Sequence, residues 1–122
     1  MDQNIKTYRD LLVWQKSTNL VLNIYALTEN FPQTEVYGLT SQMRRAAISI
    51  PSNIAEGFRR GSKKDYRHFL ITAFGSGAEL ETQIIIARQL PFGQKLDFTK
   101  VDTILEEVMK MLNSLIQRLN TD

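Results

Sequence analysis

The sequence contains no cysteine, only one histidine and no long apolar run among its 122 residues. Without cysteine, the chain has neither disulfides nor thiolate metal ligands. No segment approaches the roughly 20 uninterrupted apolar residues that a membrane-spanning helix requires. The first ten residues, MDQNIKTYRD, lack the apolar stretch of a signal peptide. These absences exclude the disulfide-rich and membrane-spanning classes, and we expect a cytoplasmic protein.

The composition favours one folded domain. Hydrophobic residues make up 43% of the chain and charged residues 23%, a balance typical of globular proteins and not of disordered ones. The length suits a single hydrophobic core, so we predict one domain over residues 1–122. The net charge of +2 is too small to indicate a nucleic-acid-binding protein by itself.

Apolar residues recur at intervals of three and four in four segments, and none of the segments shows the alternation of a β-strand. We predict helices near residues 10–30, 35–60, 63–90 and 99–120. The predicted core positions are, segment by segment, Val13, Leu20, Ile24, Leu27 and Phe31; Leu39, Met43, Ala46, Ala47, Ile50, Ile54 and Phe58; Tyr66, Phe69, Leu70, Ala73, Gly77, Leu80, Ile84 and Ala87; and Val101, Ile104, Leu105, Val108, Met111, Leu112, Leu115 and Leu119. Long helices with short connections predict an all-α fold, an up-down-up-down antiparallel four-helix bundle.

Pro51 lies inside the second predicted helix. Proline removes one backbone hydrogen bond and clashes with the carbonyl group four residues earlier. Because the apolar spacing continues on both sides of Pro51, we predict a kinked helix and not two helices.

Local signals predict where other helices end and begin. Gly61 suits the left-handed residue that ends a helix. Ser62 and Thr99 each precede an acidic residue by three positions, which predicts a capping box at the start of the third and fourth helices. Gly75 and Gly77 are unfavourable inside a helix, so we expect a neighbouring helix backbone to approach closely there.

Basic residues are concentrated in one part of the chain. Between positions 44 and 67 lie seven of the fifteen lysines and arginines, opposed by only Glu56 and Asp65. These seven are Arg44, Arg45, Arg59, Arg60, Lys63, Lys64 and Arg67. Arginine and lysine are the usual partners of phosphate groups, so the cluster is a candidate nucleic-acid-binding surface. An ordinary solvated helix face is the alternative. Phe58 and Tyr66 fit the core spacing, so reading of individual bases is not predicted.

The sequence offers no set of residues for catalysis. His68 stands alone, without a glutamate three residues before it and without other metal-ligating companions. Glu79 and Glu81 are two residues apart and point to different sides of a helix. We therefore expect no enzyme activity, no cofactor, no metal site and no catalytic residue.

Asn53 and Glu81 border the apolar stripes of the second and third helices. A buried carboxylate without a partner is costly. We expect Asn53 and Glu81 to form a structural polar link between these helices, with a ligand site as the alternative.

Three stretches resemble a known family: LLVWQKS at 11–17, YGLTSQMRRAAISIPSNIAEG at 37–57 and FGSGAELETQI at 74–84. They are similar to the four-helix-bundle proteins first associated with intervening sequences of bacterial 23S rRNA genes. That family also resembles the accessory protein of diversity-generating retroelements, a pentamer of four-helix protomers that engages nucleic acid. The resemblance implies a four-helix bundle and a homopentamer, and it favours an RNA-binding role. It supplies no catalytic residues.

Two functions follow as hypotheses. The first is a non-enzymatic oligomeric helical-bundle protein that binds structured RNA or other nucleic acid through the basic surface. The alternative is a protein–protein scaffold or adaptor ring with no nucleic-acid role and an unknown protein partner. The first and fourth segments carry more apolar surface than one core needs, which predicts a homo-oligomer. The number five comes from the resemblance alone.

Overall fold

The computed structural model describes residues 4–120, and within that range it contains helices and no strand. The four α-helices are α1 (Leu12–Thr28), α2 (Leu39–Arg60), α3 (Lys63–Gln89) and α4 (Thr99–Arg118). Three short 3-10 helices, η1 (Tyr8–Asp10), η2 (Gln33–Glu35) and η3 (Pro91–Lys95), lie between or before them. The predicted all-α fold with four long helices is confirmed.

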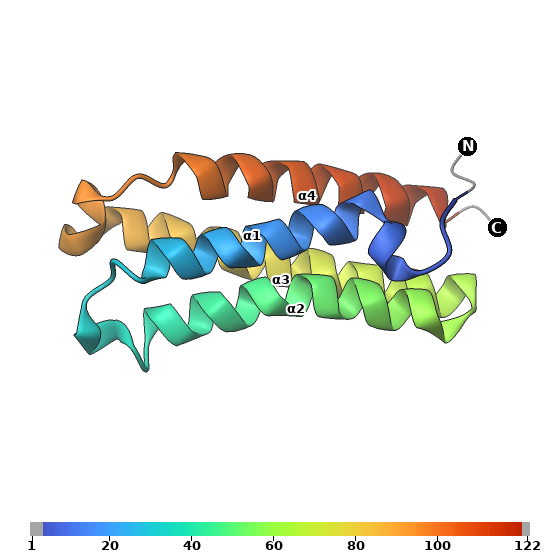
Figure 1. The fold of residues 1–122 in the computed structure, drawn as a ribbon, viewed down its shortest axis with the longest axis horizontal. Coiled ribbons are helices and arrows are strands. Elements are labelled where there is room, and N and C mark those ends of the chain that lie inside the picture. Colours follow the sequence, from blue (N-terminus) through green and yellow to red (C-terminus); the bar gives the residue numbers. More distant parts are fainter. Residues whose placement is uncertain (1–3, 121–122) are drawn as a thin grey trace.

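The helices lie lengthwise beside one another, and the chain reverses direction at each connection (Figure 1). α1 packs against α2 and α4, and α3 packs against the same two helices. The N-terminal segment, the α2–α3 turn and the end of α4 share one end of the bundle (Figure 1). None of the helices in the described range is long and apolar enough to cross a membrane.

The predicted helix faces form the hydrophobic core. Most of the predicted core positions are buried; the half-buried ones are Leu39, Phe58, Tyr66, Phe69, Met111, Leu115 and Leu119. Leu20, Ile50, Leu70 and Leu112, one on each helix, are completely buried. Burying such a side chain stabilises the fold by about 1.5–3 kcal/mol, so the apolar periodicity is the main determinant of this packing.

Two predicted helix starts were too early. The segment from position 10 begins instead with η1, and the extended Leu11 (φ −76°, ψ 127°) separates η1 from α1. The segment from position 35 begins with η2, and α2 starts only at Leu39 after Gly38. The Glu35 carboxylate accepts a hydrogen bond of 3.2 Å from the Leu39 amide, which satisfies one of the free N–H groups at the α2 start.

α2 continues through Pro51 as one helix, and Pro51 is buried within it. The prediction of one helix across Pro51 is therefore confirmed, whereas the kink stays a prediction. Gly61, with φ of 89°, ends α2 in the left-handed conformation, as predicted. The Ser62 hydroxyl accepts a hydrogen bond of 3.1 Å from the Asp65 amide and caps α3.

The predicted cap at Thr99 is wrong. The Thr99 side chain does not cap α4; instead, the carboxylate of Asp97 accepts a hydrogen bond of 2.9 Å from the Thr99 amide. Hydrogen bonds from the Thr99 side chain and amide hold the pKa of Asp97 below its usual value. Asp102, the expected partner of Thr99 in the cap, forms an ion pair with Arg88 of α3. The tertiary contact with α3 replaces the local one.

The two glycines of α3 differ in their surroundings. A Cβ atom on Gly77 would collide with the Met109 side chain of α4, so the close approach there is made by a side chain and not by a helix backbone. A Cβ atom on Gly75 would meet nothing within 4 Å. The expectation of close backbone approach is therefore wrong at both positions.

Candidate nucleic-acid interface

The helix α2 separates the seven basic residues into two groups. Arg44 and Arg45 lie in the first half of α2, and Arg59 lies near its end. The offset of fourteen positions from Arg45 to Arg59 corresponds to roughly 21 Å along the helix. The second group surrounds the turn between α2 and α3, and we call it the basic corner: Arg59, Arg60, Lys63, Lys64 and Arg67.

Arg44 is half buried and is held against α1. Its Nε donates a hydrogen bond of 2.8 Å to the Thr28 hydroxyl, and its guanidinium carbon lies 4.3 Å from the centre of the Tyr25 ring. Its Nη2 is 3.8 Å from the Glu29 carboxylate. These contacts join α2 to α1, so Arg44 acts as a structural link.

Arg45 is exposed on the same half of α2. It lines an open hollow of about 480 Å³ together with Tyr25, Val36, Thr40, Ser41, Arg44 and Ile48. Because the Arg44 guanidinium there is already engaged by Thr28 and Glu29, Arg45 is the exposed arginine of this hollow.

In the basic corner, Arg59, Arg60, Lys63 and Lys64 are exposed. Arg60 donates hydrogen bonds of 2.9 and 3.3 Å to the Glu56 carboxylate one turn earlier. An exposed pair of this kind contributes only about 0.3–0.5 kcal/mol to stability. A phosphate can therefore compete with Glu56 for the Arg60 guanidinium at little cost to the fold.

Arg67 connects the basic corner to α4. It is half buried, and its Nε donates a hydrogen bond of 3.2 Å to the Ile116 carbonyl oxygen near the end of α4. A cation at this place offsets the negative end of the helix dipole. With Lys63, Lys64 and His68, Arg67 also lines an open groove of about 460 Å³.

The two corner aromatics that the sequence assigned to the core do pack inward. Phe58 and Tyr66 are half buried and contact each other edge to face, with ring centres 5.8 Å apart. Burial raises the pKa of the Tyr66 phenol, and the charge of Arg118 opposes this shift. These rings hold the ends of α2 and α3 together.

A third aromatic, Tyr8, was missed by the sequence analysis. η1 packs on α2 and places the Tyr8 ring 5.4 Å from the guanidinium carbon of Arg59. Fifty-one positions separate these residues in the chain, so only the tertiary fold brings them together. The Thr7-x-x-Asp10 spacing of a capping box was the one local signal that could have located η1.

Asn53 and Glu81 are not hydrogen-bonded to each other in the described part of the chain. The Asn53 amide donates to the Ser49 carbonyl (2.8 Å) and hydroxyl (3.0 Å), and the Ser49 hydroxyl lies 2.7 Å from that of Ser76. A polar link between α2 and α3 therefore exists, but it runs through Ser49 and Ser76.

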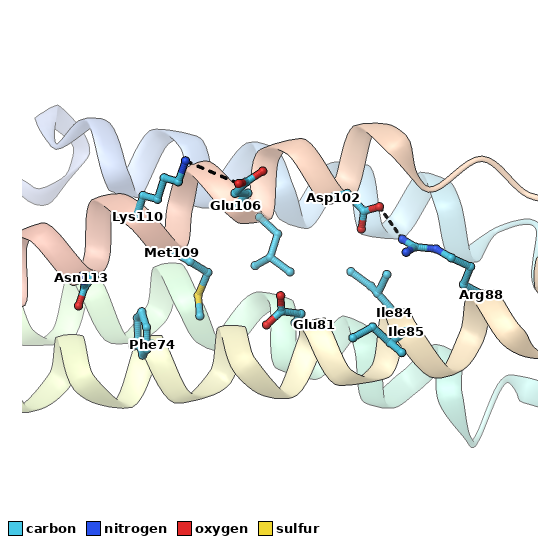
Figure 2. A pocket seen from close by; sticks show the side chains of 11 residues that line it. Phe74, Glu81, Ile84, Ile85, Arg88, Asp102, Glu106, Met109, Lys110 and Asn113 are labelled. Carbon is cyan, nitrogen blue, oxygen red and sulfur yellow. Dashed lines mark hydrogen bonds and ion pairs between the residues drawn. The ribbon is translucent and has the colours of Figure 1, made fainter.

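Glu81 is exposed and lines an open groove of about 630 Å³ between α3 and α4 (Figure 2). The apolar lining comes from Phe74, Ile84, Ile85, Leu105 and Met109. At its sides, Arg88 pairs with Asp102, and Lys110 lies 3.6 Å from Glu106. Among residues 4–120, no lysine or arginine forms an ion pair with Glu81 within the chain.

The described residues include no group of three histidine, aspartate or glutamate side chains that could hold a metal ion. His68 packs edge to face on Phe69, with ring centres 5.5 Å apart.

Comparison with known proteins identifies a family but no curated relative. No curated protein matches the chain. A family model described as "23S rRNA-intervening sequence protein" matches residues 9–114, which include all of α1, α2 and α3 and most of α4. The chain therefore belongs to the 23S rRNA-intervening sequence protein family.

Proposed function

We propose that the protein is a non-enzymatic helical-bundle protein that binds structured RNA or other nucleic acid. The basic corner would contact the phosphates of the nucleic acid. The observation that carries this proposal is the exposure of Arg59, Arg60, Lys63 and Lys64 around one tight turn. The family name, which refers to 23S rRNA intervening sequences, is consistent with an RNA-linked role.

The geometry of the corner suits contacts to phosphates better than sequence-specific contacts to base edges. Gly61 and Ser62 alone separate α2 from α3, so basic side chains from two helices project around the same turn. Side chains with several N–H donors, such as Arg59 and Arg60, bind phosphate oxygens from more than one direction. Contacts to phosphates position a nucleic acid without reading its sequence.

The test is to replace Arg59, Arg60, Lys63 and Lys64 with glutamine and to measure RNA affinity at several salt concentrations. Each lost phosphate contact should reduce the log–log salt slope by about 0.7 for single-stranded RNA, so the slope should fall by up to about 3. We expect most of the low-salt affinity to disappear, with the melting temperature and the oligomer mass unchanged.

A matched pair of double variants provides the control. Lys63→Gln with Lys64→Gln removes two charges from the basic corner, whereas Lys95→Gln with Lys100→Gln removes two exposed charges in and after η3. Only the first pair should weaken binding. Equal binding by the two variants would rule out the basic corner as the nucleic-acid surface. Loss of the oligomer in the first variant would instead assign these residues a structural role.

A protein–protein scaffold is the second candidate, and exposed apolar side chains support it. The exposed large apolar side chains within the α-helices belong to α1, α2 and α3. They are Leu12, Leu22, Tyr25, Ile48, Ile71, Ile85 and Ile86. Within the described range, α4 contributes none of them, contrary to the expectation for the fourth segment. Unpartnered apolar surface of this kind favours self-association.

We propose a homo-oligomer, with five subunits favoured by the family resemblance. Light scattering at micromolar concentration should report a mass several times that of the 14.0 kDa chain. A monomer mass would contradict the oligomer, while the phosphate-binding proposal would still stand on the salt-dependence experiment.

A further inference from the structure

We propose that Tyr8 and Arg59 form a stacked platform for an unpaired nucleobase, so that the basic corner favours single-stranded segments over continuous duplex. This inference rests on the proposed function and adds to it a preferred form of nucleic acid. The stack would be Tyr8, then the Arg59 guanidinium, then the base.

The platform consists of a planar cation on an aromatic ring. The Arg59 guanidinium carbon lies 5.4 Å from the centre of the Tyr8 ring, and the Arg9 guanidinium carbon lies 5.6 Å from it. Tyr8 itself rests edge to face against Trp14, with ring centres 5.3 Å apart. Guanidinium planes and aromatic rings are the two kinds of surface on which proteins stack splayed-out bases.

η1 holds Tyr8 in position through a compact set of hydrogen bonds. The Thr7 hydroxyl accepts from the Arg9 amide (3.1 Å), and the Asp10 carboxylate accepts from the amides of Lys6 (2.8 Å) and Thr7 (3.0 Å). The Gln15 side chain donates to the Arg9 carbonyl oxygen (2.8 Å) and ties η1 to α1. A platform fixed before binding loses little conformational entropy when a base stacks on it.

A hollow next to this platform has room for a base. It has a volume of about 470 Å³ and is lined by Tyr8, Ser52, Ala55, Glu56, Arg59 and Arg60. The Ser52 hydroxyl and the Glu56 carboxylate offer hydrogen-bonding groups to the edge of a base. Arg59 and Arg60 belong to both the hollow and the basic corner, so a strand held by its phosphates at the corner passes directly beside it.

Base pairing decides which nucleic acids can use such a platform. In a duplex, each base is stacked between its neighbours, and its faces are unavailable to the protein. In a loop, bulge or single strand, a base can leave the stack at little cost and lie on Arg59. The preference should therefore be for unpaired nucleotides, of any sequence, because every base has a flat face.

The experiment compares three probes by fluorescence anisotropy: a short oligouridylate, an abasic oligomer with the same number of phosphates, and an RNA duplex. The oligouridylate should bind at least about fivefold more tightly than the abasic oligomer, the lower limit for stacking one base. When probes with equal numbers of phosphates are compared, the duplex should bind with about the same affinity as the abasic oligomer. The fluorescence of Trp14, the single tryptophan and a neighbour of Tyr8, should change with the oligouridylate only.

Three variants separate stacking from charge. Arg59→Lys keeps the positive charge but removes the planar face, so it should keep the salt slope and lose the preference for bases over abasic sites. Tyr8→Leu should lose the same preference, whereas Tyr8→Phe should retain it. Arg45→Lys, the matched exchange at an exposed arginine away from the corner, should change nothing.

Equal affinity for the oligouridylate and the abasic oligomer would overturn the platform while leaving phosphate binding intact. Retention of the base preference in both Arg59→Lys and Tyr8→Leu would also overturn it. Failure of all three probes to bind would refute the proposed function, and the platform with it. If Tyr8→Leu lowers the melting temperature, the Arg59→Lys result decides alone, because that exchange keeps Tyr8, its contact with Trp14 and the hydrogen bonds that hold η1.

Discussion

Replacing Gly57 with alanine is expected to destabilise the protein, whereas the same replacement at Gly75 is expected to stabilise it. Gly57 is buried in α2 where α3 packs against it: a Cβ atom there would lie 2.7 Å from the Phe69 Cβ and 3.2 Å from the Tyr66 carbonyl oxygen. Neither atom can rotate away, so α2 and α3 must separate. A Cβ atom on Gly75 meets nothing within 4 Å.

The magnitudes follow from two opposing effects. Alanine gains about 1 kcal/mol over glycine inside a helix, and overpacking of a well-packed core costs about 1–3 kcal/mol. Because the atoms met at Gly57 are a backbone oxygen and a Cβ, we take the upper part of that range. The net loss for Gly57→Ala is then about 1–2 kcal/mol, and Gly75→Ala should gain about 0.5–1 kcal/mol.

Urea unfolding followed by circular dichroism, at one fixed protein concentration, measures both changes. The concentration must be fixed because self-association would shift the apparent stability. In thermal unfolding of the same samples, the melting temperature should fall by about 3–10 °C for Gly57→Ala and rise by a few degrees for Gly75→Ala. Equal or higher stability of Gly57→Ala would show that α2 and α3 are not in contact as described, and the geometry of the basic corner would need revision.

Three further outcomes are expected. Arg44→Ala should lower the free energy of unfolding by about 1–2 kcal/mol because it removes the hydrogen bond to Thr28 and the contact with the Tyr25 ring, whereas Arg45→Ala should leave it unchanged in the same urea experiment. Backbone hydrogen bonds hold the pKa of Asp10 below its usual 3.8, so the stabilisation of η1 is complete above pH 3.8 and is lost as the pH falls through the lower folded value. During acid titration, Trp14 fluorescence should therefore change only below pH 3.8. A change centred near neutral pH would contradict the assignment to Asp10. A crystal structure should show the axis of α2 bending within one turn of Pro51, and a straight axis would refute the kink.

The helices themselves were predictable from the sequence because their cause is local. Apolar spacing of three and four residues placed Leu20, Ile50, Leu70 and Leu112 in the core, and all four are fully buried. Gly61 marked the end of α2 because glycine, which has no Cβ atom, adopts the left-handed conformation without steric cost. The same reasoning misplaced the starts of α1 and α2, since the residues before them form 3-10 turns that follow no apolar period.

The candidate site depended on tertiary structure. In the sequence, Arg44 and Arg59 belong to one basic run, but the rise of a helix puts them at different parts of the bundle, and Arg44 is used to bind α1. Tyr8 lies far from Arg59 in the chain, and no local pattern predicts that η1 packs on α2. Thr99 failed as a cap because Phe98, and not Thr99, is the N-cap residue of α4, and the Asp102 carboxylate pairs with Arg88 of α3. Sequence spacing reports which residues share a helix face, whereas contacts between helices depend on how those faces are brought together, and only the folded bundle decides that.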